Sequence, residues 1–159
     1  MGIFDGLQDA QMPGGGRFFT DGVYLVDVIL AKSGESQQGK GAYVAIEAKN
    51  VETLVEFPAG RISDIDGSVM PASCVAGETL SNVIMMRTQP AASNIKGFLV
   101  AATGLTPDQI TSAVAEKAFG GDGKALAGVR LIARAATIKT KAGRPFTKVT
   151  WERPQVPAE

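Results

Sequence analysis

Eight of the sixteen lysines and arginines in this 159-residue sequence lie between residues 124 and 153, where Glu152 is the only acidic residue. This stretch has a net charge of +7, from eight positive charges and one negative charge, and the neutral total leaves −7 elsewhere. Phe146 and Trp151 lie in the same stretch. Cations that follow a phosphate backbone, with rings on which bases stack, are the basic requirements for binding single-stranded nucleic acid. A solvated strand whose lysines prevent edge-to-edge aggregation gives the same pattern.

Residues that could carry catalysis are scarce. The sequence has no histidine, the commonest general base, so its single cysteine, Cys74, has no histidine to activate it. Residues 34–40 match the start of a phosphate-binding P-loop, but Gly41 stands where Ser or Thr would bind magnesium. Asp64 and Asp66 resemble part of a calcium loop whose closing glutamate is missing. We therefore expect no enzymatic activity, no metal and no cofactor.

Length and composition favour one globular domain with one core. The 159 residues are 45% hydrophobic and 20% charged. No apolar run approaches the length of about 18 residues that spans a membrane, and the first residues lack the basic start and apolar core of a signal peptide. A single cysteine cannot form an intramolecular disulfide, which agrees with a reducing compartment. We expect a soluble intracellular protein that does not contact a membrane.

The elements that must position the cationic residues follow from the hydrophobic pattern. Ile3, Phe4 and Leu7 have the spacing of an amphipathic turn, and residues 13–16 (Pro-Gly-Gly-Gly) then break it, so we expect residues 1–16 to form a flexible arm. Runs of apolar and β-branched residues predict five strands. These strands are expected at residues 17–31, 43–57, 80–87, 126–140 and 146–153.

Two helices are expected between the third and fourth strands. Ser93 is expected to cap the first helix, and Gly104 to end it. Thr106 is expected to cap the second helix, with Pro107 at its first position. Residues 58–77, which precede the third strand, are rich in turn formers and predict a loop. The apolar face of the first helix consists of Ile95, Phe98, Leu99 and Ala102.

Alternation along the strands predicts which side chains face solvent. In the second strand, Val44, Ile46 and Ala48 form the expected buried face, and the residues between them form the solvated face, which consists of Tyr43, Ala45, Glu47 and Lys49. In the last strand, Phe146 shares a face with Lys148, so it is the expected stacking residue. Trp151 has the opposite phase and fits the core at least as well as a groove. Arg130 and Arg134 share one face of the fourth strand with Ile132, where they could extend the groove or shield an edge.

Three strands, a helical connection and two strands predict a mainly β protein with a short helical insertion. This order is typical of the five-stranded OB-fold barrel, with the helices between strands 3 and 4. The OB-fold domain is expected at residues 17–153, followed by a short tail at residues 154–159. Another β-barrel, or a sandwich with an inserted helical pair, has the same order of elements and remains open.

Parts of the sequence also resemble a known family. The segments GVYLVDVILAKSGESQQGKGAYVAIEAKNVET, SNIKGFLVAATGL and LAGVRLIARAATIKTKAGRPFTKVTWER are similar to small proteins from the replication and recombination modules of tailed bacteriophages. The similarity spans residues 18–153. It implies an OB-fold single-stranded DNA-binding protein, active in the host cytoplasm. Many such proteins recruit partners through an acidic C-terminal tail, which this chain lacks, since only Glu159 follows Glu152.

The sequence therefore predicts a single-stranded DNA-binding protein of a phage replication or recombination module, without sequence preference. Its partners would be single-stranded DNA and phage replication or recombination proteins, with a homo-oligomer also possible. The candidate DNA-binding residues are the cationic and aromatic side chains of the first loop, the second strand and the last two strands: Lys40, Tyr43, Lys49, Arg130, Arg134, Lys139, Lys141, Arg144, Phe146 and Lys148.

Two alternatives belong to other classes of protein. High glycine content and overall neutrality suit a structural virion protein, such as a capsid-decorating or tail-associated β-barrel whose glycine-hinged arm grips a neighbour. The basic hairpin could also dock on an acidic protein partner.

Overall fold

The computed structural model describes residues 17–35, 42–85 and 89–154. The expected arm at residues 1–16, Lys40 and residues 155–159 of the tail lie outside the described residues. The elements run in the order β1 (Arg17–Phe18), β2 (Gly22–Glu35), β3 (Ala42–Val55), β4 (Arg61–Ile62), β5 (Val69–Met70), β6 (Thr79–Met85), α2 (Gln89–Thr103), η1 (Pro107–Gln109), α3 (Ser112–Phe119), β7 (Arg130–Lys139) and β8 (Pro145–Glu152). The described chain is mainly β, as the sequence predicts.

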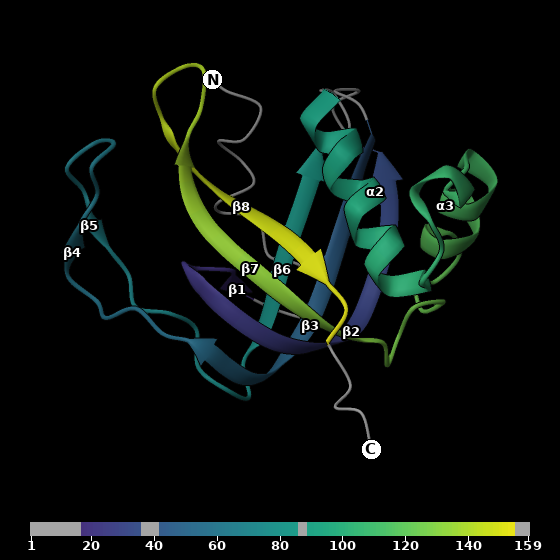
Figure 1. The fold of residues 1–159 in the computed structure, drawn as a ribbon, viewed down its shortest axis with the longest axis horizontal. Helices are drawn as coiled ribbons and strands as arrows, with labels where there is room; N and C mark the ends of the chain where they lie inside the picture. Colours follow the sequence, from purple (N-terminus) through teal and green to yellow (C-terminus); the bar gives the residue numbers. More distant parts are fainter. Residues whose placement is uncertain (1–16, 36–41, 86–88, 155–159) are drawn as a thin grey trace.

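Six strands form one curled sheet, which makes a half-barrel (Figure 1). Their order is β1-β6-β3-β2-β7-β8, and neighbouring strands are antiparallel except for the parallel pair β1 and β6. The long strand β2 is central, because it pairs with β3 on one side and with β7 on the other. Its register with β3 shifts between Val28 and Leu30, and such bulges increase twist and bend a strand. This bulge helps the sheet to curl.

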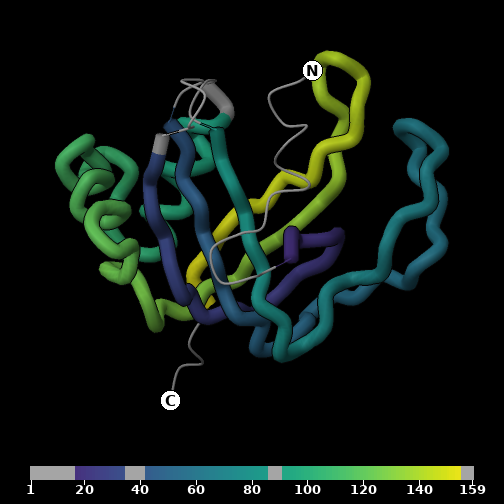
Figure 2. The backbone as a smooth tube through the Cα atoms, turned by 180° about the vertical axis from the view of Figure 1, so that it is seen from behind, coloured from purple at the N-terminus to yellow at the C-terminus, as the bar shows by residue number. Residues whose placement is uncertain are grey.

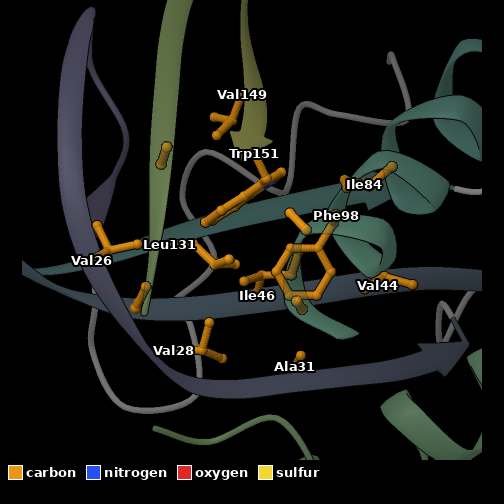
Figure 3. Close-up of a cluster of buried hydrophobic side chains, with 14 of the residues drawn as sticks. Val26, Val28, Ala31, Val44, Ile46, Ile84, Phe98, Leu131, Val149 and Trp151 are labelled. Carbon is orange, nitrogen blue, oxygen red and sulfur yellow. The ribbon is translucent and has the colours of Figure 1, made fainter. Parts of the chain in front are cut away.

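The core lies between the concave face of the sheet and α2 (Figure 3). The predicted apolar face of α2 is confirmed, because Ile95, Phe98, Leu99 and Ala102 are all buried. Trp151 of β8 is buried against the edges of two rings, with centroid distances of 5.1 Å to Phe98 and 5.8 Å to Phe19. Trp151 is therefore a core residue.

The first predicted strand is interrupted. The chain leaves β1 at Phe18 and enters β2 at Gly22, and the Tyr24 hydroxyl fixes this bend by donating a 2.7 Å hydrogen bond to the Thr20 carbonyl. The same oxygen accepts a 3.0 Å hydrogen bond from the Cys74 backbone N–H. A Cβ atom at Gly22 would lie 2.7 Å from this hydroxyl oxygen, so the position needs glycine.

Two helix boundaries differ from the sequence prediction. The prediction that Ser93 caps the first helix is wrong, because α2 begins at Gln89 and includes Pro90 in its first turn, where proline is well tolerated. The predicted second helix is divided in two. Pro107 begins the short 3₁₀ turn η1, and Thr111 caps α3 by accepting a 3.3 Å hydrogen bond from the Val114 N–H.

Two further differences concern exposure and loops. Ala45 and Glu47 were expected on a solvated face of the second strand, but both are buried, so that prediction is wrong. The alternation of residues along a strand indicates how polar each of its faces is, but it does not show whether another part of the chain covers that face. Residues 58–77, expected to form a loop, contain the separate two-stranded hairpin of β4 and β5.

Candidate nucleic-acid interface

The hairpin of β7 and β8 projects beyond the rest of the sheet (Figure 1). Its turn is held by hydrogen bonds from the Thr140 N–H to the Arg144 carbonyl at 2.9 Å and from the Gly143 N–H to the Thr140 carbonyl at 2.9 Å. Gly143 has a φ of 79°, a left-handed conformation that glycine adopts without strain. Residues 141–146 are all exposed. The hairpin therefore presents its tip to solvent on a fixed backbone.

Strand register separates the side chains of this hairpin into two faces. On the outward face, Phe146 lies opposite Ile138, and Lys148 lies opposite Ala136. The exposed fractions are 45% for Phe146 and 41% for Ile138, so this pair forms an apolar patch in solvent. Trp151 lies on the inward face with Val149, as the sequence phase predicts. Of the two aromatic rings on this hairpin, that of Phe146 is therefore the one accessible for stacking.

Four cations lie on this hairpin, and strand alternation places one of them, Lys139, which lies opposite Pro145, on the face away from Phe146. Lys139 precedes the turn, Lys141 and Arg144 lie within it, and Lys148 shares the outward face with Phe146. Among residues 17–35, 42–85 and 89–154, no carboxylate forms an ion pair with any of the four. Their charge is therefore not neutralised by the described part of the protein.

Two predicted cations are already paired. The Arg130 guanidinium donates to both oxygens of Asp27, at 2.8 Å and 3.0 Å, and Arg134 forms an ion pair with Glu152. The hydrogen bonds from Arg130 hold the pKa of Asp27 below its ordinary value, and the positive charge of Lys49 contributes. Any anionic ligand would have to compete with these carboxylates, so Arg130 and Arg134 are less available to it than the four hairpin cations.

Tyr43 and Lys49 do not belong to the hairpin surface. Tyr43 is half-buried at the start of β3, where a Cβ atom on Gly34 would lie 2.7 Å from its ring. Lys49 is exposed and lies opposite Asp27. Because β7 pairs with β2 only over residues 22–27, Tyr43 lies at a different part of the sheet from the β7–β8 hairpin. Lys40 lies outside the described residues.

The hairpin of β4 and β5 also projects from the sheet, and it was not predicted from the sequence. Its cross-strand pair, Ile62 and Val69, is strongly exposed. Arg61 lies with its guanidinium carbon 4.7 Å from the centroid of the Phe57 ring. The dipeptide Asp66-Gly67, between the β-branched residues Ile62 and Val69, is a hairpin signal that could have identified it.

Asp21 links the bases of the two hairpins. Its Oδ2 lies 3.6 Å from Nη1 of Arg61, and its Oδ1 accepts a 2.6 Å hydrogen bond from the hydroxyl of Thr137 in β7. The base of the β4–β5 hairpin is therefore tied to the β7–β8 hairpin, and exposed aromatic and apolar side chains are present on both.

A scan against models of known protein families finds no match, and neither does a search of curated protein sequences. No helix within the described ranges is long and apolar enough to cross a membrane. Within the same ranges, no group of three or more cysteine, aspartate or glutamate side chains could hold a metal ion. The function must therefore be inferred from the residues of the β7–β8 hairpin.

Proposed function

We propose that this protein binds single-stranded DNA, without sequence preference, as part of a phage replication or recombination module. The observation that carries the proposal is the exposed Phe146 on a projecting hairpin with four cations that form no ion pair with any described residue. Phosphates would contact the cations, and a base would stack on the Phe146 ring, with Ile138 extending the apolar surface. Since every base has an aromatic face, such a surface binds with little regard to sequence.

We also propose that the curled sheet is an OB-fold barrel. In the pairing order β6-β3-β2-β7-β8, three neighbouring strands (β2, β3 and β6, with the separate β4–β5 hairpin inserted between β3 and β6) are followed by the last pair, β7 and β8, and α2 and α3 come between the two groups in the chain. This arrangement supports the OB-fold, in which strand faces and inter-strand loops bind oligonucleotides. In that fold, the turn at residues 140–144 joins the last two strands, so the proposed site uses a loop of the kind that binds nucleic acid.

Titration of fluorescently labelled oligo(dT) at two salt concentrations tests the proposal. Each neutralised phosphate releases counterions, so the logarithm of the binding constant should fall with the logarithm of salt concentration, by about 0.7 per phosphate contacted. Affinity that does not depend on salt, or the absence of binding at low salt, would contradict the proposal.

One observation favours a second candidate, a structural virion protein. The exposed pair Ile62 and Val69 on the β4–β5 hairpin is apolar surface of the kind that protein partners cover. The basic hairpin could likewise dock on an acidic protein. Failure to bind oligo(dT) at low salt would favour these protein-binding functions.

A further inference from the structure

The outward face of β3 and β6 contains side chains that are buried although they point away from the core. Glu47 is 4% exposed, and its neighbour across the strands, Ser81, is 1% exposed. Ala45, two residues along β3, is 5% exposed. Along β3, Ala45 and Glu47 alternate with Val44 and Ile46, which belong to the core under α2.

No helix or strand of the described chain covers this outward face. Helix α2 packs on the opposite, concave face, and Figure 2 shows the outward side of β3 and β6 with no coloured element crossing it. Leu30 and Val83 flank Glu47 and Ala45 along the sheet, but both are themselves only half-buried. Neighbours in the plane of a sheet cover the sides of a glutamate and leave its carboxyl end open. Another segment must therefore lie over Glu47.

The covering segment must be largely apolar where it meets Glu47. Glu47 Oε1 and Ser81 Oγ both lack a hydrogen-bond partner among the described residues. Burial raises the pKa of Glu47, which favours its neutral form. A covering segment rich in polar groups would be expected to satisfy these atoms.

We propose that residues 1–16 of the same chain cover the outward face of β3 and β6. Arg17 and Phe18 pair with Leu80 and Ser81 of β6, so the segment before Arg17 joins the sheet at the edge of this face. Sixteen residues can span up to about 50 Å when extended, whereas neighbouring strands lie only about 5 Å apart. Ile3, Phe4 and Leu7 supply the apolar side chains.

This docking does not depend on the proposed DNA binding. It would shield Ala45 and Glu47, two residues of the strand face that the sequence predicts to be solvated. The segment would then act as a fixed part of the fold and not as a flexible arm.

Thiol labelling of the full-length protein tests the docking. In the variant Ala45→Cys, a small change, the new thiol should react slowly with a thiol reagent, and the buried Cys74 gives the background rate. Adding Phe4→Asp and Leu7→Asp should increase the labelling rate of residue 45 at least tenfold, because the apolar contacts are lost. Gln8→Asp with Gln11→Asp is the matched control for the two added charges, and Thr150→Cys is the exposed control for the reagent.

A second measurement uses the unmodified sheet. The methyl resonances of Val83 should shift between the wild type and the Phe4→Asp, Leu7→Asp variant, whereas those of Val149 in the core should not. Fast labelling of residue 45 in the otherwise unaltered chain would overturn the proposal. Slow labelling of residue 45 that persists in the Phe4→Asp, Leu7→Asp variant would overturn the proposal too. If that slow labelling depends on protein concentration, a second copy of the protein covers the face.

Discussion

Glu47 is a buried carboxyl group whose pKa is raised by burial, so its effect on stability depends on pH. The unfolded chain loses this proton at the ordinary pKa of glutamate, about 4.3, before the folded chain does. Stability conferred by the neutral form is therefore present below that pH and is lost as pH rises to the raised pKa of the folded state. Glu47→Gln removes this loss, so it should raise the Tm at pH 7 by a few degrees more than at pH 4.

Thermal unfolding of the wild type and of Glu47→Gln across that pH range measures the effect. Glu52→Gln, at an exposed position of the same strand, is the matched control and should show no such pH-dependent gain. A difference in Tm between Glu47→Gln and the wild type that stays constant with pH would show that folding does not raise the pKa of Glu47.

Substitutions of Phe146 and of Trp151 should have separate effects, the first on oligo(dT) affinity and the second on the stability of the fold. Phe146→Ala should weaken oligo(dT) binding by about 1–3 kcal/mol, the range for loss of one stacked base, with a modest change in stability because the ring is exposed. Trp151→Ala should instead reduce the free energy of unfolding by about 3–5 kcal/mol, since it leaves a cavity between Phe19 and Phe98. Denaturant unfolding and oligo(dT) titration of both variants measure this, and a destabilised Phe146→Ala with unchanged affinity would assign Phe146 to packing.

At the scale of elements, the β7–β8 hairpin was predictable from sequence and its ion pairs were not. Alternation and the turn residues Ala142 and Gly143 determine the strands and the faces of Phe146 and Trp151. The partner of Arg130 is Asp27, 103 residues earlier, and this contact depends on which strands become neighbours. The burial of Glu47 was not predicted for the same reason, because a strand pattern contains no information about which distant segments lie near it.

Removing the carboxylate that pairs with an arginine should increase oligo(dT) affinity, whereas removing a cation should reduce it. Glu152→Gln removes the carboxylate that neutralises Arg134, so it should increase oligo(dT) affinity at low salt by several-fold. Thr150→Val, on the same face of β8, is the control that leaves the ion pair intact. If Glu152→Gln has no effect on affinity, Arg134 lies outside the bound strand's path.

At the scale of the whole molecule, the basic hairpin projects from a half-barrel with a buried core. The core under α2 determines stability, and the hairpin cations determine binding, so the two properties should change independently. Lys139→Glu with Lys141→Glu should reduce oligo(dT) affinity tenfold or more and leave the Tm almost unchanged, because both residues are exposed near the turn. Lys96→Glu with Lys117→Glu, exposed on the two helices, is the charge-matched control.

The salt dependence of oligo(dT) binding by these two double variants tests the central claim most directly. If the hairpin lysines contact phosphates, Lys139→Glu with Lys141→Glu should reduce the log–log salt slope by about 1.4, at about 0.7 for each lost contact, relative to the wild type. The helix control, Lys96→Glu with Lys117→Glu, should keep the wild-type slope. Equal slopes for the wild type and both double variants would contradict the claim that the β7–β8 hairpin binds single-stranded DNA.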